Sequence, residues 1–300
     1  MKVTKVRKSG NVAIVGRSNT GKSTLLNAIL GQKLVIVSHK PQTTRQNILG
    51  ILTDADYQTV LLDTPGLMHR TRDTLDQRMN RSVIDAINSA DLVLLVIEPF
   101  LPSRLEIQLI NHLKENSVPS ILVINKIDLI RKEKLLPVIA AYADIYTFAD
   151  IIPVGALQKE GISLLMARIK AHLPVGDHEY DQDQITDRPE RFFAAEFIRE
   201  QLFLVYGQEV PYDTAVVIEE FQEQNPVQGG KDVIVAMIYV SKPSQRRILI
   251  GSGGKLLKKV GIAARIEIER MTGRPAYLDL TVTVREKWRQ RDDFLEAAGY

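Results

Sequence analysis

Short aliphatic runs alternate with longer amphipathic segments over the first half of the chain. This alternation is typical of β-α-β units, which form a mainly parallel sheet with helices on both faces. We therefore predict an α/β domain over residues 1–174. Its expected strands are residues 11–15, 59–62, 91–97, 120–124 and 150–154, and its clearest expected helices are residues 22–30 and 75–89.

The pattern changes after residue 174. Residues 175–189 are acidic and poor in aliphatic side chains, and we expect them to form a linker. Residues 190–300 predict an α+β domain with the order α-β-β-α-α-β, in which Asp187 is the expected cap of the first helix. The expected strands are residues 214–221, 232–240 and 276–285, and the expected later helices are residues 244–250 and 255–272.

Composition limits the classes of function. The chain has 300 residues, of which 45% are hydrophobic and 25% charged, as expected for a folded globular protein of two domains. It has no cysteine, which excludes disulfides, thiolate metal sites and cysteine nucleophiles. We expect neither an export signal nor a membrane span, because the longest apolar stretches are far below roughly 18 residues. The net charge is only +3, so an argument for nucleic acid must rest on where the charges lie.

A phosphate-binding motif lies between the first expected strand and the first expected helix. Residues 16–23 read GRSNTGKS and match the P-loop pattern G-x-x-x-x-G-K-[ST]. Backbone N–H groups of such a loop surround the β-phosphate, Lys22 reaches the β and γ oxygens, and the hydroxyl of Ser23 binds Mg²⁺. The predicted nucleotide-binding residues here are Gly16, Arg17, Ser18, Asn19, Thr20, Gly21, Lys22, Ser23 and Thr24.

A second motif follows the expected strand at 59–62. Residues 63–66 read DTPG. Asp63 is the expected outer Mg²⁺ ligand, and the N–H of Gly66 is the expected contact of the γ-phosphate. Thr64 and Pro65 lie between them and are also predicted to line the nucleotide site.

A third motif selects the base. Residues 125–128 read NKID, and Asn125, Lys126 and Asp128 are the predicted binding residues. The Asp128 carboxylate can accept hydrogen bonds from both N1–H and N2–H₂ of guanine, a pairing that adenine does not offer. Because buried polar partners can reject the wrong base by about 10⁴-fold, the motif predicts GTP and disfavours a kinase or an ATPase.

The three motifs together resemble those of the translation-factor-related small GTPases, in the same order and with similar spacing. The resemblance extends to a turn at Gly155 and Ala156, where the family usually has Ser-Ala, so this chain keeps the backbone N–H that faces the guanine O6 but lacks a hydroxyl. Residues 41–45, PQTTR, are the expected switch I segment. We expect Thr44, rather than Thr43, to bind Mg²⁺ there.

The sequence identifies the residues for hydrolysis less completely than those for nucleotide binding. Ras-type enzymes orient the attacking water with a glutamine directly after the DxxG glycine, and here that position is Leu67. Lys22, Thr44 and Gly66 are the expected catalytic residues, and we expect slow intrinsic turnover that a partner accelerates. Asn19 resembles the asparagine that binds K⁺ in potassium-activated relatives, which makes K⁺ a candidate activator beside Mg²⁺.

The second domain carries a nucleic-acid signal. Gly251 and Gly254 form G-x-x-G between two expected helices, and the order α-β-β-α-α-β matches a type II KH domain, whose G-x-x-G turn clamps about four single-stranded nucleotides. Trp288 could stack on a base, although packing against the terminal helix is the simpler interpretation. The predicted RNA-binding residues are Arg246, Arg247, Ile250, Gly251, Ser252, Gly253, Gly254, Lys255, Lys258 and Lys259.

Charge supports this interpretation. Residues 242–274 include nine basic residues and only two acidic ones, Glu267 and Glu269. A solvated helical face is the alternative explanation, and the G-x-x-G turn makes a phosphate track the better one. The nine basic residues are Lys242, Arg246, Arg247, Lys255, Lys258, Lys259, Arg265, Arg270 and Arg274.

Taken end to end, the chain resembles the bacterial Era GTPase family. The resemblance lies in GRSNTGKS (16–23), PQTTR (41–45), DTPGL (63–67), NKID (125–128), RFFAAEFIRE (191–200), IGSGGKLLKKVGIAAR (250–265) and the terminal Gly299-Tyr300. It implies a P-loop G domain followed by a type II KH domain.

The resemblance also implies a function. It implies Mg²⁺-dependent GTP hydrolysis, binding near the 3′ end of 16S ribosomal RNA, a role in maturation of the 30S subunit, and RNA capture in the GTP state. It further implies a cytoplasmic monomer loosely associated with the inner membrane surface. Two alternatives stay open: a membrane-associated signalling switch without sequence-selective RNA binding, and an RNA-binding module with an inactive G domain.

Overall fold

A computed structural model describes residues 7–207, 209–224 and 230–300, so the first six residues of the first predicted domain lie outside it. The chain divides into two compact units. Unit 1 holds the chain up to Val35, Thr44–Arg72 and Asp76–Asp187, and unit 2 holds Ile36–Thr43, Asp73–Leu75 and Arg188–Tyr300. In the described residues no helix is long and apolar enough to cross a bilayer.

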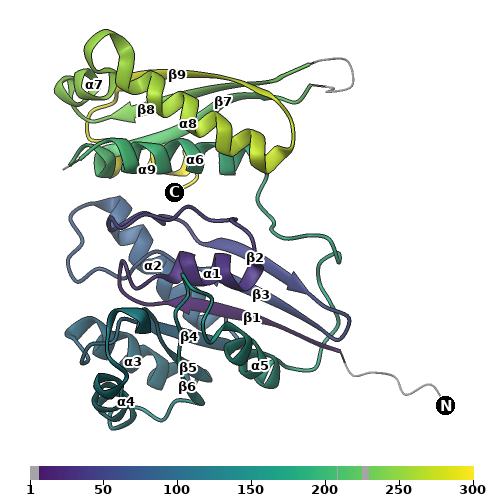
Figure 1. Cartoon of the computed structure of the whole chain (residues 1–300). Coiled ribbons are helices and arrows are strands. Elements are labelled where there is room, and N and C mark those ends of the chain that lie inside the picture. The colour runs from purple at the N-terminus through teal and green to yellow at the C-terminus, as the bar shows by residue number, and fades with distance from the viewer. Residues whose placement is uncertain (1–6, 208, 225–229) are drawn as a thin grey trace. The chain divides into compact units, whose positions relative to one another are not determined.

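Unit 1 is built on a six-stranded sheet in the order β2-β3-β1-β4-β5-β6 (Figure 1). All neighbours are parallel except β2 and β3, which are antiparallel. The predicted mainly parallel α/β fold is therefore confirmed. The strands are β1 (Lys8–Val15), β2 (Ile48–Thr53), β3 (Tyr57–Asp63), β4 (Leu92–Ile97), β5 (Ser120–Ile124) and β6 (Asp150–Pro153).

The edge strand β2 is absent from the expected elements. Gly50 interrupts its apolar pattern, and glycine is depleted in strands. The packing explains the glycine, because a Cβ at Gly50 would meet Leu26 Cδ1 at 2.9 Å and Leu30 Cδ1 at 3.0 Å. The outer edge of β2 is covered by the 175–187 segment, where Ile51 N–H donates to the Ile185 carbonyl (2.8 Å).

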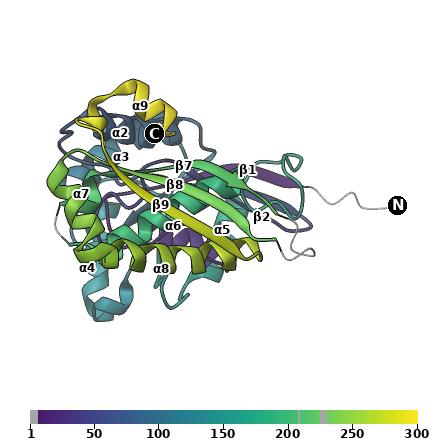
Figure 2. The ribbon, with the colours of Figure 1, turned by 90° about the horizontal axis from the view of Figure 1, so that it is seen from above.

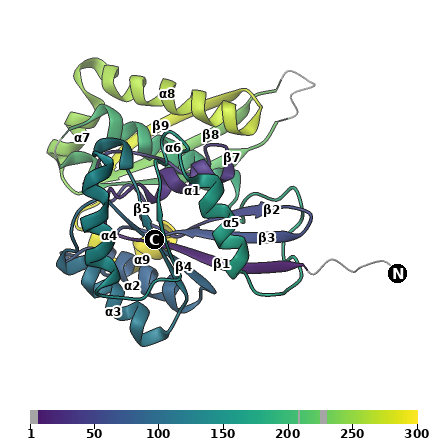
Figure 3. The same ribbon diagram turned by 60° about the horizontal axis from the view of Figure 1, so that its bottom comes forward.

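Helices cover both faces of this sheet (Figures 1 and 3). α2, α3 and α4 pack with Ala13, Val15 and Leu95 in one apolar cluster. α1 and α5 contact each other and the opposite face. The helices are α1 (Lys22–Leu30), α2 (Thr74–Asn88), α3 (Arg104–Asn116), α4 (Leu135–Ala143) and α5 (Ile162–His172).

Unit 2 contains a three-stranded sheet in the order β7-β8-β9, with β7 and β8 antiparallel and β8 and β9 parallel. Its chain order confirms the predicted α-β-β-α-α-β arrangement. β8 alternates strictly between buried and half-buried side chains, so one face packs on helices (Figure 2). The elements are α6 (Glu190–Val205), β7 (Thr214–Gln222), β8 (Asp232–Val240), α7 (Pro243–Ile250), α8 (Lys255–Thr272), β9 (Ala276–Val284) and α9 (Asp292–Ala297).

The start of α6 differs from the prediction. Pro189 is the residue at the N-cap, and no side chain caps the helix, so the prediction of Asp187 as the cap is wrong. Capping uses the side chain of the N-cap residue itself, and Asp187 lies two residues before Pro189. The acidic Glu190 in the first turn instead complements the helix dipole.

α6 is also buried more completely than a single apolar stripe requires. Its charged residues Glu196, Arg199 and Glu200 are buried, with Arg199 only 1% exposed. Within unit 2, Arg199 pairs with Glu196 and donates to the Thr43 carbonyl, while Glu200 accepts from Val37 N–H (3.1 Å). Residues 36–43 therefore belong to unit 2 because backbone groups of this segment are bound by the charged side of α6.

Trp288 is packed and not available for stacking on a base. It is fully buried, its ring contacts those of Phe294 and Tyr300, and its indole N–H donates to the Asp213 carbonyl (3.3 Å). The sequence-based alternative of a base-stacking tryptophan is therefore wrong. Phe294 of α9 also contacts the Tyr239 ring of β8, so Trp288 packs on the terminal helix through a residue that joins this helix to the sheet.

We expect Trp288→Ala to destabilise unit 2 by about 3–5 kcal/mol, because it leaves a large cavity between α9 and β8. Hydrogen exchange of the β8 amides, followed by mass spectrometry, measures this loss of protection. Leu204→Ala is the matched control, since Leu204 is 61% exposed on α6 and its truncation should change protection by less than about 0.5 kcal/mol. Equal exchange in the two variants would contradict the packing described here.

Candidate nucleotide site and nucleic-acid interface

The phosphate-binding loop leaves β1 and enters α1 at the carboxyl edge of the sheet. A Cβ at Gly16, where φ is +153°, would lie 2.2 Å from the Val96 carbonyl oxygen. A Cβ at Gly21, where φ is +92°, would lie 2.2 Å from the Asn125 side-chain nitrogen. Only glycine fits at either position, so the loop passes close to β4 on one side and to the NKID segment on the other.

Lys22 lies inside this loop. Its side chain is buried, and its ammonium donates to the carbonyls of Gly16 (3.2 Å) and Arg17 (2.8 Å). Burial lowers the pKa of Lys22 to about 8, and the nearby Asp63 carboxylate opposes that shift. A bound phosphate would favour the charged form further, because an anion at this position interacts only with the ammonium form.

The three predicted Mg²⁺ ligands lie together. Ser23 Oγ donates to Asp63 Oδ2 (2.7 Å) and lies 2.9 Å from Thr44 Oγ1, which also donates to Asp63 Oδ2 (3.3 Å). Thr43 lies elsewhere, since its hydroxyl donates to the Lys40 carbonyl (2.7 Å). The geometry thus favours Thr44 over Thr43 at this site.

The carboxylate of Asp63 is suited to a cation. Asp63 is fully buried, and its Oδ1 has no hydrogen-bond partner. Burial raises its pKa to about 6, although Lys22 and the hydroxyls of Ser23 and Thr44 oppose the rise. A buried carboxylate with an unused oxygen gains most from a divalent cation, which would stabilise its charged form.

The DTPG segment packs directly on the phosphate loop. A Cβ at Gly66 would lie 2.5 Å from the backbone nitrogen of Ser18, so this approach requires glycine. Thr64 and Pro65 are buried, and the Thr64 hydroxyl donates to the Ile14 carbonyl (2.9 Å). Leu67 is 4% exposed and belongs to the apolar cluster under α2, so its side chain serves packing and cannot orient water.

The NKID segment is tied to the phosphate loop by its first two residues. Asn125 Nδ2 donates to the Thr20 carbonyl (2.8 Å), and Asn125 Oδ1 accepts from Ala156 N–H (3.1 Å). Lys126 donates to the Asn19 carbonyl (2.6 Å). Asn125 thereby brings together three of the predicted segments, including the turn at 155–156.

Asp128 occupies the exposed rim of the site, where a base could reach it. Its Oδ2 accepts from Gln158 Nε2 (3.3 Å), a partner that sequence analysis missed. Gly155 is buried, and its backbone N–H and carbonyl pair with Glu160. Of the remaining predicted residues, Ser18 and Asn19 lie in the loop itself, and Thr24 lies half-buried in the first turn of α1.

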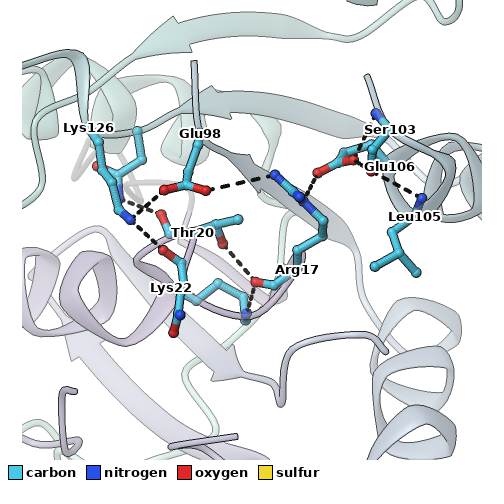
Figure 4. Close-up of polar contacts among 10 residues, drawn as sticks. Arg17, Thr20, Lys22, Glu98, Ser103, Leu105, Glu106 and Lys126 are labelled. Carbon is cyan, nitrogen blue, oxygen red and sulfur yellow. Dashed lines mark hydrogen bonds and ion pairs between the residues drawn. The ribbon is translucent and has the colours of Figure 1, made fainter. Parts of the chain in front are cut away.

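Two further acidic residues adjoin the loop and were not predicted (Figure 4). Glu98 accepts from Lys126 (2.6 Å), and its other oxygen lies 3.8 Å from the Arg17 guanidinium. Glu106, whose side chain is 2% exposed, forms an ion pair with the other side of Arg17. The available signal was position, because Glu98 directly follows the buried strand β4 as Asn125 follows β5.

In unit 2 the G-x-x-G turn joins α7 to α8. Gly251 has φ +70° and ψ −179°, a conformation open essentially only to glycine, and a Cβ there would meet Leu256 Cγ at 2.9 Å. Gly253 (φ +59°) and Gly254 (φ +75°) face open space. Close approach of a ligand backbone is therefore sterically open at 253 and 254, while Gly251 is required by the fold. Ser252 and Lys255 are exposed beside them, and Ile250 is half-buried at the end of α7.

A groove of about 470 Å³ runs from this turn between α8 and β9. Of its lining residues, Gly254 and Lys258 are predicted RNA-binding residues, and Arg265 belongs to the predicted phosphate track. Most of the others are apolar or aromatic side chains whose exposure depends on the packing of α8 against the sheet. The additional lining residues are Lys231, Leu257, Gly261, Ile262, Ala276, Tyr277, Leu278 and Leu280.

The basic patch is narrower than the sequence suggests. Arg265 and Arg270 pair on α8 with Glu269 (3.5 Å) and Glu267 (2.6 Å), and Arg274 pairs with Asp232 (2.8 Å) and with Glu190. Arg246 donates through Nε to the Val282 carbonyl (2.9 Å) and so supports β9. The phosphate track predicted from nine basic residues thus centres on five exposed ones: Lys242, Arg247, Lys255, Lys258 and Lys259.

Comparisons with known proteins agree with this geometry. A family model described as 50S ribosome-binding GTPase matches residues 11–126, and one described as KH domain matches residues 209–289. GTPase Era of Lactobacillus helveticus is 45% identical over 293 residues, which cover 98% of this chain and 96% of the relative. The chain belongs to the Era GTPase family. It is therefore a GTP hydrolase with a G domain and a KH domain, as predicted.

Two solved Era structures match the fold over nearly the whole chain. A variant of Aquifex aeolicus Era bound to GDP and aluminium fluoride is 37% identical, with a TM-score of 0.93, and the match covers 98% of this chain and 99% of that one. Era in complex with MgGDPNP and nucleotides 1506–1542 of 16S ribosomal RNA is 36% identical, with a TM-score of 0.94 and the same coverage.

Asp128→Asn should exchange the base preference of this Era family member. An asparagine offers one acceptor and one donor, which fit N1–H and O2 of xanthine but not the two donors of guanine. We expect GDP to bind about 30- to 100-fold more weakly and XDP to bind better than GDP. Competition with a fluorescent nucleotide measures both affinities.

Gln158→Ala provides the control for that exchange. It removes the amide that contacts Asp128 but keeps the carboxylate, so the preference for GDP over XDP should persist. An Asp128→Asn protein that still prefers GDP would show that another group reads the base.

Proposed function

We propose that this GTPase binds single-stranded RNA near the 3′ end of 16S ribosomal RNA and acts in maturation of the 30S subunit. Three observations support the proposal: the nucleotide loops of unit 1, the G-x-x-G turn of unit 2, and similarity to an Era structure that contains nucleotides 1506–1542 of 16S ribosomal RNA. We propose the cytoplasm as its location, loose association with the inner membrane surface, and a monomeric state.

The observation that carries the RNA part is the groove between α8 and β9. It begins at Gly254, where nothing lies within 4 Å of an added Cβ, and it is lined by Lys258, Ile262 and Tyr277. An open glycine admits a phosphate, lysine neutralises it, and apolar or aromatic walls accept unstacked bases. A groove with these three features can bind both the phosphates and the bases of single-stranded RNA, whereas a helical face that carries only charge can bind the phosphates alone.

We further propose that the two domains have separate binding functions. Residues 1–174 would form the GTP-binding domain, residues 175–189 the linker and residues 190–300 the RNA-binding domain. The nucleotide-binding residues would be residues 16–24, 63–66, 125, 126, 128, 155 and 156, and the RNA-binding residues would be residues 246, 247, 250–255, 258 and 259. Among the latter, Arg246 and Gly251 would act by supporting the fold next to the RNA.

Magnesium fits the unit 1 site. The hydroxyls of Ser23 and Thr44 and the unused oxygen of Asp63 are hard oxygen donors of the kind that Mg²⁺ prefers. When bound, Mg²⁺ would neutralise charge on the β- and γ-phosphates. Lys22 would hold the same oxygens from the other side, and the Gly66 N–H would contact the γ-phosphate.

The leucine at position 67 bears on the expected rate of GTP hydrolysis. Because Leu67 is packed in the core cluster, this chain lacks the Ras-type water-orienting side chain at that position. Lys22 and the backbone N–H groups of the loop can stabilise developing charge on the phosphoryl group. We therefore propose slow intrinsic hydrolysis that rises when the RNA-bound state completes the site.

The experiment is GTP hydrolysis with and without an RNA that copies the 3′ end of 16S ribosomal RNA. We expect the RNA to stimulate hydrolysis by about tenfold or more and Gly254→Asp to abolish that stimulation, because a carboxylate at this turn repels phosphate. Gly254→Asp should keep the basal rate, since the altered residue lies in unit 2 and faces open space. Gly251→Asp is a poorer choice, because its Cβ would collide with Leu256.

Each outcome separates the candidate functions. Retention of RNA together with stimulation that Gly254→Asp removes supports the proposal. Turnover indifferent to RNA, with no RNA retained and with nucleotide-dependent binding to anionic vesicles, would replace it by the membrane-associated switch. RNA binding without any GTP turnover would indicate a module with an inactive G domain.

We also propose K⁺ as an activator held near Asn19. Asn19 is an exposed residue of the phosphate loop, in the left-handed backbone conformation with φ +69°. We expect hydrolysis to be about tenfold faster in KCl than in NaCl, because K⁺ would supply positive charge where an arginine finger acts in other GTPases. Equal rates in the two salts at constant ionic strength would remove K⁺ from the proposal.

A further inference from the structure

The loop that binds phosphate is held by side chains that bind its carbonyl oxygens. Thr20 Oγ1 and Lys22 donate to the Arg17 carbonyl (3.1 and 2.8 Å), Lys126 donates to the Asn19 carbonyl (2.6 Å), and Asn125 donates to the Thr20 carbonyl (2.8 Å). A loop whose carbonyls are bound from outside can direct its N–H groups inward, as a phosphate nest requires. The donors outside the loop, Asn125 and Lys126, therefore help to set its shape.

These two donors differ in how firmly they are fixed. Asn125 is 2% exposed and is held at both ends of its amide. The Lys126 side chain is 30% exposed and ends four flexible bonds from the backbone, so it needs a second partner to keep one position. That partner is Glu98, at 2.6 Å from the ammonium.

Glu98 is itself positioned by a chain of alternating charges (Figure 4). One of its oxygens accepts from Lys126, and the other faces Arg17 at 3.8 Å. The opposite side of Arg17 pairs with Glu106, which also accepts from Ser103 N–H (3.0 Å) in the capping box of α3. The order Lys126, Glu98, Arg17, Glu106 thus connects the guanine-specific segment to the phosphate loop and anchors both on α3.

We propose that Glu98 is a positioning residue for guanine nucleotide, which holds the Lys126 ammonium on the Asn19 carbonyl and so fixes the spacing between the guanine-specific segment and the phosphate loop. Glu98 acts through Lys126 and does not touch the nucleotide. Its role is geometric, since an ion pair of this exposure contributes little to stability by itself.

The direction in which nucleotide affinity changes when Glu98 loses its charge distinguishes a positioning role from a purely electrostatic one. A carboxylate close to a phosphate site repels the phosphates, so removing its charge would strengthen binding if charge were its whole effect. If Glu98 instead holds Lys126 in place, removing its charge weakens binding of a nucleotide that spans both segments. The two explanations therefore predict opposite changes in GDP affinity.

The test compares Glu98→Gln with Asp150→Asn in the full chain. Asp150 is the matched control, because its side chain is 22% exposed against 23% for Glu98 and it pairs with Arg168 (3.5 Å) at the amino end of β6, away from the nucleotide motifs. We expect Glu98→Gln to weaken GDP binding about five- to tenfold and to raise the KM for GTP by a similar factor, with kcat unchanged. Asp150→Asn should leave both affinities unchanged.

A double-mutant cycle with Lys126→Met shows which residue transmits the effect. We expect Lys126→Met alone to weaken GDP binding and Glu98→Gln to add nothing in that background. A full additional loss in the double variant would overturn the proposal, because Glu98 would then act without Lys126.

Three other results would also overturn it. The first is tighter GDP binding by Glu98→Gln, and the second is unchanged GDP binding. The third is a loss of affinity accompanied by a fall in thermal midpoint more than about 2 °C beyond that of Asp150→Asn, which would show that Glu98 supports the fold alone.

Discussion

The nucleotide site depends on the burial of one lysine and one aspartate at the carboxyl edge of a parallel sheet. Lys22 and Asp63 end up close enough to influence each other's pKa because β1 and β3 are parallel neighbours, so the segments that follow them leave the sheet at the same edge. Burial disfavours the charged form of both groups. Such a site gains free energy when it receives an anion beside the lysine and a cation beside the carboxylate.

Glycines make this arrangement possible by allowing backbone to approach backbone. Gly16 lets the phosphate loop pass the Val96 carbonyl, and Gly66 lets the DTPG segment rest on Ser18. The close approach explains why Leu67, the next residue, points into the apolar cluster and not toward the nucleotide. The same packing that places Gly66 against the phosphate loop therefore removes residue 67 as a candidate for orienting water.

Glycines also shape the G-x-x-G turn of unit 2, where they have two different roles. At the G-x-x-G turn, Gly251 is needed by its own neighbours, while Gly253 and Gly254 leave open space. The charged residues around the turn also divide into two groups. Those in the second half of α8 or just after it pair with carboxylates, as Arg274 does with Asp232, whereas Lys258, near the turn, is exposed. A local net charge counted along the sequence overestimates the free positive charge for this reason.

Sequence determined the local features of this protein. Residues 22–30, 120–124, 232–240 and 255–272 were predicted with the bounds that the structure has. The two helices lie between glycines, and the two strands are a continuous and an alternating apolar run. The three nucleotide motifs and the G-x-x-G turn could be read directly, since each requires particular residues at fixed spacing in a short segment. The family followed from their combination.

Tertiary structure decided what depends on neighbours distant in sequence. β2 was missed because Gly50 breaks its pattern, yet the side chains of Leu26 and Leu30 pack closely over this glycine. The apolar groove of Ile262 and Tyr277 and the pairing of Glu98 with Lys126 likewise join residues that are distant in sequence. For Trp288, packing decided between the two interpretations that the sequence left open. Sequence patterns report which side chains a segment offers, whereas packing decides which of them meet. The chain therefore specified the chemistry of its sites, and only the fold specified their partners.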